Sequence, residues 1–244
     1  MSYTVDGYIT DRPVAANALP AERVAFIRRT YAHVAGAILA FAGLEGLLIK
    51  SGIGIAVMQS LFGGNSALLV LMLLFVGGGY LAQYWAHSAT SRGMQYAGLA
   101  LYVLLQVIIF LPILTIASEA PVFANQNVIA KAGVMTLAIF AGLTTAVFVT
   151  RQDFSFLGPI LSVISWGVLG LILIVMLFPG SGLSLGTWFS FGMVGLAAAF
   201  IIYDTSNVLH HYRTDQYVGA ALQLFASVAL LFFYILRILM SRRD

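Results

Sequence analysis

Long apolar stretches recur along the chain between Thr30 and Leu239, each of about 20 residues, with short polar segments between them. At a rise of 1.5 Å per residue, about 20 helical residues cross a hydrocarbon layer of about 30 Å. The stretches do not alternate apolar and polar residues as barrel strands do, so helices are predicted. The seven predicted spans are Thr30–Ile49, Ser66–Trp85, Met94–Ala117, Asn127–Thr150, Leu157–Phe178, Gly186–Val208 and Gln216–Leu239.

Two smaller features interrupt this pattern. The apolar stretch from Gly52 to Gly63 is too short to span and is expected to lie in the membrane interface. The run Gly77-Gly78-Gly79, inside the second predicted span, marks either a kink or a close helix contact. The chain is thus divided into an N-terminal tail (1–29), a seven-helix transmembrane domain (30–239) and a short basic tail (240–244).

The composition is that of an integral membrane protein, so the lipid bilayer is its predicted partner. Of 244 residues, 61% are hydrophobic and 9% are charged, whereas a soluble domain carries roughly 25% charged residues. The net charge of +3 is spread over loops and tails and forms no clustered basic face, so no nucleic-acid partner is predicted. The absence of cysteine excludes disulfides, thiol catalysis and cysteine metal sites.

The distribution of Lys and Arg predicts the orientation of the spans. With a cytoplasmic N-terminus, the inner side carries most of the cations, and the outer loops carry only Lys50 and Lys131. The basic C-terminal tail then falls outside. Either it is tolerated there, or the last segment is re-entrant and six helices span; we predict seven. The inner cations are Arg12, Arg23, Arg28, Arg29, Arg92, Arg151 and Arg213.

Asp204 is the most informative ionisable residue, because a charge in hydrocarbon costs at least about 2.5–3.5 kcal/mol. It lies near the inner end of the sixth predicted span, after four mainly apolar residues. It is either a buried, titrating carboxylate on an ion path, which we favour, or a helix-end carboxylate bonded to hydroxyls or reaching water. Glu45, in the outer half of the first span, is interpreted as an edge residue that reaches water.

The last predicted span carries a polar stripe within about 80° of the helix circumference. Such a stripe should face protein or water, so this helix is predicted to lie inside the bundle. Two of its members, Gln223 and Ser227, either line a path or form hydrogen bonds between helices. The stripe consists of Gln223, Ser227, Tyr234 and Arg237.

All four histidines fall in the cytoplasmic layer under this topology: His33, His87, His210 and His211. Asp204 and His211 share a helical face if the sixth helix continues to residue 211. Histidine changes its charge near neutral pH, with an ordinary pKa of about 6.5. The layer therefore either gates a path by protonation or simply meets lipid headgroups.

Several chemistries are excluded by what the sequence lacks. A Schiff-base lysine is absent from the spans, a membrane aspartyl protease would need two membrane aspartates, and a rhomboid-type GxSG serine with its histidine is missing. No nucleotide-binding or HExxH motif occurs. The protein is therefore predicted not to be an enzyme and to need no cofactor, and no oligomeric state follows from the sequence.

The stretch Tyr203-Asp204-Thr205-Ser206-Asn207, followed by an inner loop and the final helix, resembles the Bax-inhibitor/YccA family, also called the transmembrane Bax inhibitor motif family. Further matches are the segment from Thr150 to Leu157 and the aromatic-rich helix from Leu222 to Arg237, so the resemblance extends from about Arg28 to Arg237. It implies an all-α fold in which two three-helix layers wrap a central seventh helix, in a bacterial inner membrane.

For one branch of the family, the resemblance implies a pH-sensitive calcium leak, in which aspartates on helices six and seven pair and a basic residue ending helix two latches the pore. Asp204 matches the first aspartate, but the second falls on Ser227, so this chain lacks the pair. The latch falls on His87 or, after a small insertion, on Arg92. A metal site, if any, would use Asp204 and hold Ca²⁺ only transiently, because Ca²⁺ takes 6–8 oxygen ligands.

The sequence therefore supports two alternative functions. The first is a cation or proton leak through Asp204, lined by Gln223 and Ser227, whose pH switch uses Asp204 with His33, His87 and His211. The alternative is a non-transporting modulator of a membrane quality-control protease of the FtsH type, which the YccA branch resembles. In that case the tail from Met1 to Glu22 is a docking handle. A secondary transporter is a weaker third option, since no inverted repeat is seen.

Overall fold

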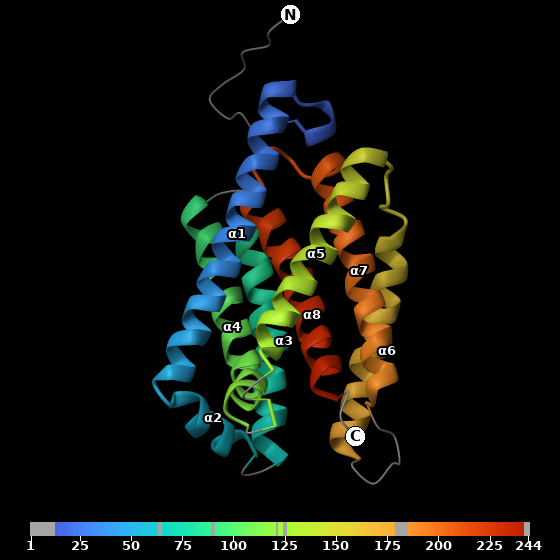
Figure 1. The fold of residues 1–244 in the computed structure, drawn as a ribbon. Helices are drawn as coiled ribbons and strands as arrows, with labels where there is room; N and C mark the ends of the chain where they lie inside the picture. The colour runs from blue at the N-terminus through green and yellow to red at the C-terminus, as the bar shows by residue number, and fades with distance from the viewer. Residues whose placement is uncertain are drawn as a thin grey trace, which may run out of the picture.

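The computed structural model describes residues 13–62, 65–88, 91–120, 122–123, 126–178 and 185–241, with the backbone alone for residues 61, 62 and 65–69. The described residues form α-helices and one short 3-10 helix, with no strand among them (Figure 1). The elements are η1 (Ala15–Asn17), α1 (Pro20–Lys50), α2 (Ile53–Phe62), α3 (Asn65–Ala86), α4 (Arg92–Glu119), α5 (Val128–Thr150), α6 (Leu157–Leu177), α7 (Thr187–His210) and α8 (Tyr217–Ser241).

The predicted spans correspond to α1 and α3 to α8, which makes the chain an all-α, multi-pass membrane protein. Six helices among the described residues are long and apolar enough to cross a membrane; α3 contributes the shorter apolar stretch Val70–Ala86, so the count of seven stays a prediction. α8 is one continuous helix of 25 residues, without a re-entrant turn. The stretch that was predicted to lie in the membrane interface corresponds to α2, a helix of 10 residues. Gly63, the predicted end of this stretch, lies outside the described residues.

The helix boundaries have local causes. α1 begins at Pro20, ten residues before the predicted span, because proline suits the first turn, where no backbone N–H needs an intrahelical partner. At the start of α4, the side chain of Ser91 accepts a hydrogen bond from the Met94 backbone N–H. α5 ends at Arg151, which takes a left-handed conformation (φ 53°).

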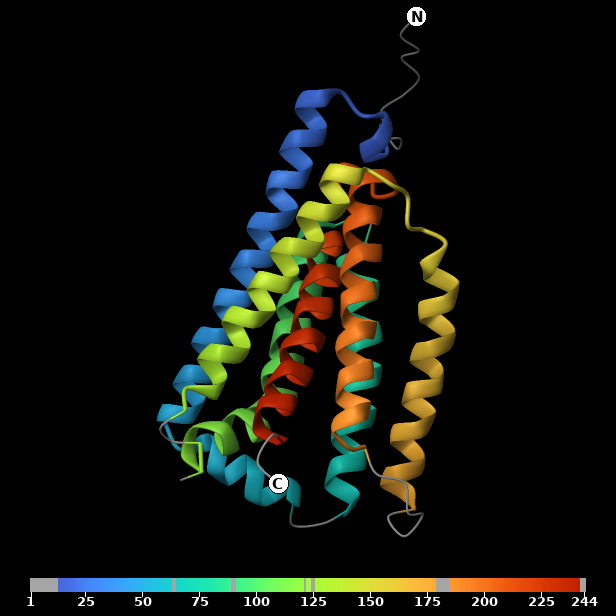
Figure 2. The same cartoon turned by 45° about the vertical axis from the view of Figure 1, so that its right-hand side comes forward.

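α8 is the central helix of the bundle (Figures 1 and 2). It packs against α1, α3, α4, α5 and α7. Around it, α1 and α3 pack on α4, while α5 and α6 pack on α7, which yields the two three-helix groups that were predicted. α6 is peripheral: Leu161 is its one buried residue. The polar stripe of α8 therefore lies inside protein, as predicted.

Small residues permit the closest helix contacts. A Cβ placed on Gly78 would lie 2.9 Å from the Leu105 side chain, so the glycine run of α3 marks a close contact with α4, within an uninterrupted helix. A Cβ on Gly219 would lie 3.0 Å from the Ala86 carbonyl oxygen, where α8 meets the end of α3.

The start of α1 and the end of α8 lie at opposite ends of the bundle (Figures 1 and 2). The end of the bundle that carries His33, His87, His210 and His211 is named the histidine end here. At this end, the segment before α1 docks on the α7–α8 loop: the Ala15 N–H donates to the Tyr212 carbonyl (2.8 Å), and the Thr214 N–H donates to the Pro13 carbonyl (3.3 Å). Ala15 is fully buried by this contact.

Candidate functional site

The centre of the candidate site is a buried hydrogen bond between the last two helices. Asp204 lies on α7, six residues before the end of that helix, and is 5% exposed. The hydroxyl of Ser227, on the central helix α8, donates to Asp204 Oδ2 at 2.5 Å. The resemblance, which put the second position of the pair on Ser227, thus agrees with the geometry: one carboxyl faces one neutral hydroxyl.

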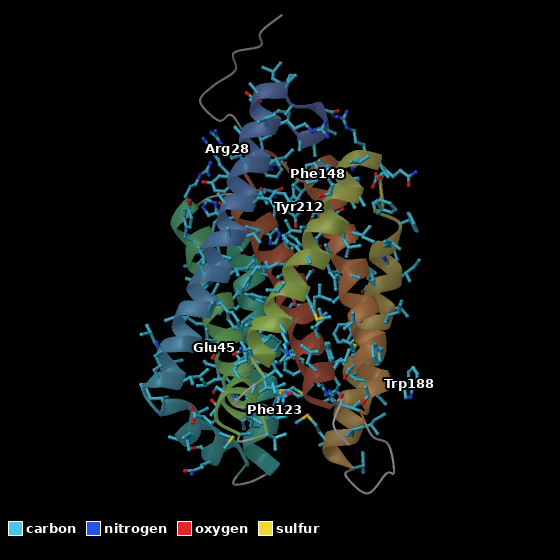
Figure 3. All side chains as sticks on the ribbon, viewed as in Figure 1. Arg28, Glu45, Phe123, Phe148, Trp188 and Tyr212 are labelled. Atoms are coloured by element: carbon cyan, nitrogen blue, oxygen red, sulfur yellow. The ribbon has the colours of Figure 1, made fainter. Side chains whose placement is uncertain are left out.

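Tyrosines surround this carboxyl from several elements. Tyr31 of α1, Tyr102 of α4 and Tyr212 of the α7–α8 loop all lie within electrostatic range of Asp204. Burial raises the pKa of Tyr212 well above its ordinary value, and the charge of Asp204 raises it further. Figure 3 shows Tyr212 toward the histidine end of the bundle. Tyr212 is therefore a neighbour of the carboxyl that lies toward that end.

The tyrosines were missed by the sequence reasoning. Tyrosine is common in membrane helices and loops, so neither hydropathy nor spacing marked them. The Tyr31 hydroxyl faces the hydroxyls of Thr144 and Thr205, and these three buried groups have no well-formed hydrogen bond among the described residues. Polar atoms thus continue from Asp204 toward α1 and α5.

His87 contacts this assembly through Tyr212. Its ring stacks on Tyr212, with 6.1 Å between ring centroids, and its Nδ1 bonds to the Gln83 carbonyl at 2.8 Å. Arg92, the second candidate for the latch, lies instead over the ring of Tyr217, 4.9 Å from its centroid. Of the two candidates, His87 is the one in contact with a neighbour of Asp204.

His211 does not lie beside Asp204, because α7 ends at His210 and the chain turns outward. Its Nε2 lies 3.0 Å from Asp153, in the α5–α6 loop, and both side chains are about half exposed. The pKa of Asp153 is lowered to about 2, first by the Ser155 backbone N–H that bonds to it and then by His211. The predicted face shared by Asp204 and His211 is therefore replaced by a surface pair.

His33 belongs to a separate cluster at the histidine end. Its Nε2 lies 3.1 Å from the Tyr96 hydroxyl, and its ring is 5.1 Å from that of Tyr217. Two guanidinium groups, from Arg29 and Arg92, lie over the Tyr217 ring. The predicted histidine layer is thus three local clusters, around Tyr212, Asp153 and Tyr217.

The other members of the polar stripe bond to protein. The Gln223 side chain donates to Gln83 of α3 (3.3 Å), as expected for a hydrogen bond that joins helices. Arg237 donates to the Leu185 carbonyl, before α7, and Tyr234 packs edge-on against Phe189 of α7. Of the stripe, Ser227 is the member that bonds to Asp204.

Glu45 was misinterpreted as an edge residue: it is only 4% exposed. It lies on the buried face of α1, one turn beyond Phe41, and both carboxyl oxygens lack a hydrogen-bond partner among the described residues. Figure 3 shows it in the half of the bundle away from the histidine end. The spacing of Val34, Phe41 and Glu45 is a signal that could have placed it on this face.

The orphaned carboxyl of Glu45 yields a stability prediction. We expect Glu45→Leu to stabilise the protein by about 1 kcal/mol, because a buried polar group without a partner costs about 1–3 kcal/mol. The melting temperature in detergent should then rise by about 2–4 °C. The matched control is Glu119→Leu, at an exposed carboxylate ending α4, which should change little. A lower melting temperature for Glu45→Leu would contradict the prediction.

The described residues contain no cluster of three or more His, Asp or Glu side chains able to hold a metal ion. Asp204 has one carboxyl and one hydroxyl neighbour in Ser227, far short of the 6–8 oxygens of a resident Ca²⁺. The described residues around Asp204 therefore do not fit a resident Ca²⁺. The docking handle from Met1 to Glu22 lies partly outside the described residues, which begin at residue 13.

These features define a polytopic helical membrane protein with a buried carboxyl between its last two helices. A family model described as "Inhibitor of apoptosis-promoting Bax1" matches residues 23–244, so the chain belongs to the Bax inhibitor-1 family. Bax inhibitor 1 of Schizosaccharomyces pombe is 32% identical over 117 residues, 48% of this chain and 44% of its own. An uncharacterized protein of Pseudomonas aeruginosa is 36% identical over 112 residues, 46% of this chain and 49% of its own.

Both matches thus span about half the length of those curated relatives. A longer match is to Protein LIFEGUARD 3 of Arabidopsis thaliana, which is 26% identical over 239 residues, 96% of this chain and 92% of its own. No solved structure matches the chain.

Proposed function

We propose that this protein is a pH-sensitive cation leak in a bacterial inner membrane, with Ca²⁺ as the transported ion and Asp204 as the gating group. The observation that carries the proposal is the 2.5 Å hydrogen bond from Ser227 to the buried Asp204. It joins α7 to the central helix α8, which contacts both three-helix groups. A change at this bond therefore acts on the helix that holds the bundle together.

Asp204 supplies the pH response through this hydrogen bond. A hydrogen bond to an ionised carboxylate is about twice as strong as one between neutral groups. Protonation of Asp204 weakens its bond to Ser227 and with it the α7–α8 contact. In acid the structure loses a contact that keeps α7 and α8 together, and the leak opens.

In this proposal, the histidine end of the bundle closes the ion path that leads from Asp204 to the cytoplasm. With a cytoplasmic N-terminus, this end faces the cytoplasm; here the α7–α8 loop, which follows the helix of Asp204, carries Tyr212, on which His87 stacks, and contacts the docked segment at Ala15. Loss of the α7–α8 contact therefore loosens the α7–α8 loop that carries Tyr212.

Calcium flux into liposomes tests the proposal. Vesicles containing a calcium dye should fill about fivefold faster at pH 6 than at pH 8, because the charged hydrogen bond is worth about 1 kcal/mol more than a neutral one. Asp204→Asn, which cannot ionise, should lose most of this difference. Glu119→Gln, at an exposed carboxylate of the opposite end, should keep it. Background flux at both pH values in wild type and variant alike would refute the leak.

A further inference from the structure

An open groove runs along the outer surface of the bundle between α1 and α4. It has a volume of about 570 Å³ and an almost entirely apolar lining. Gly36, Ala40 and Leu44 line it from α1, and Val103 and Leu104 line it from α4. Leu104 is 50% exposed, so the groove faces the surroundings of the bundle, which in a membrane are lipid.

The groove has the length of one lipid leaflet. Its α1 wall runs from Ala32 to Leu44, twelve residues apart, which is about 18 Å of helix. Half of a hydrocarbon core of about 30 Å is about 15 Å. Small residues on α1 make room along this length: a Cβ placed on Gly36 would meet no atom within 4 Å. The shape suits an extended acyl chain that enters from the histidine end.

Cationic groups stand where the groove reaches the histidine end. His33 and Tyr96 form this end of the lining, and both contact Tyr217. The guanidinium groups of Arg29 and Arg92 lie 5.8 and 4.9 Å from the centre of the Tyr217 ring. Among the described residues, neither arginine has a carboxylate within 4.0 Å. Two cations without an acidic partner thus lie at the headgroup level of an apolar groove.

We propose that this groove is a binding site for an anionic phospholipid, with one acyl chain along Gly36 and Ala40 and the phosphate on Arg29 and Arg92. Guanidinium groups bind phosphate oxygens through paired hydrogen bonds. Tyr96 and Tyr217 lie beside them, and tyrosine is enriched at the interface between membrane and water. A second copy of the chain is the less suitable occupant, because two-fold pairing through the groove would bring the two arginine pairs together.

Lipid retention measures this site directly. The purified protein is saturated in detergent with phosphatidylglycerol or phosphatidylcholine of identical acyl chains, and bound lipids are counted by native mass spectrometry. Wild type should retain more phosphatidylglycerol, and the double variant Arg29→Gln/Arg92→Gln should lower the affinity for phosphatidylglycerol about tenfold and remove its advantage over phosphatidylcholine, whose phosphate charge is already balanced by the choline cation. Gly36→Leu, which fills the groove, should lower retention of both lipids.

Matched controls separate the groove from general effects. Arg151→Gln removes an exposed arginine that ends α5, and Gly142→Leu enlarges an equally open glycine on α5; both should behave as wild type. Equal retention of the two lipids by wild type, or a phosphatidylglycerol preference that survives Arg29→Gln/Arg92→Gln, would overturn the proposal. So would displacement of the lipid by inorganic phosphate alone, or a lipid-free dimer that Gly36→Leu dissociates.

Discussion

The Ser227→Asp substitution is expected to lower the calcium concentration for half-maximal flux about tenfold at pH 8, and to lose this advantage at pH 6. The Ser227 hydroxyl lies 2.5 Å from Asp204 Oδ2, so an aspartate there places two carboxyl groups in contact. Two carboxylates attract Ca²⁺ more strongly than one and supply more of its oxygen ligands. At pH 6 protons compete with calcium for both groups, because metal ligands must be deprotonated.

The dependence of flux on calcium, measured in vesicles at several pH values, checks this prediction. The pH dependence of flux should also extend over a wider pH range, since two carboxyl groups in contact repel each other and lose their protons in two separate steps. Ser227→Asn is the control, because it has the size of aspartate without the charge. A calcium affinity that is equally changed by Asn and Asp would show a steric effect, and no change with either variant would contradict a path at this position.

The Gly98→Ala substitution is expected to destabilise the bundle by about 3 kcal/mol, the upper part of the range for overpacking. A Cβ on Gly98 of α4 would lie 2.5 Å from the Ala82 carbonyl oxygen and 2.5 Å from the Ala86 backbone N–H nitrogen. Both are backbone atoms of α3, so no side-chain rotation relieves the contact and the helices must separate.

Thermal unfolding in detergent checks this prediction, with a melting temperature lowered by about 6–12 °C. Gly133→Ala on α5 is the matched control, because a Cβ there meets no atom within 4 Å. Since α3 ends next to His87, the contact of His87 with Tyr212 should weaken as well. Equal melting temperatures for the two variants would contradict the close α3–α4 contact.

The resemblance and the polar stripe of α8 together predicted the central helix and the Asp204–Ser227 pair. The central position of α8 could be predicted from its own sequence, because polar residues such as Gln223 and Ser227 on an apolar helix face protein and not lipid. The shared face of Asp204 and His211 was predicted only for a sixth helix that continues to residue 211, and α7 ends at His210. One residue of further helix would have kept its side chain on the face of Asp204, whereas the chain turns and pairs it with Asp153.

By itself, the sequence determined that this is a multi-pass helical membrane protein, where its helices lie, and that Asp204 of α7 is a carboxyl among apolar residues. Hydropathy and helical periodicity are properties of single segments, so they can be read without knowing the neighbours. Only the tertiary structure decided that Glu45 is buried, that Tyr212 lies within electrostatic range of Asp204 and that Arg29 and Arg92 meet over Tyr217. Each of these depends on side chains from separate helices, and packing alone determines which of them meet.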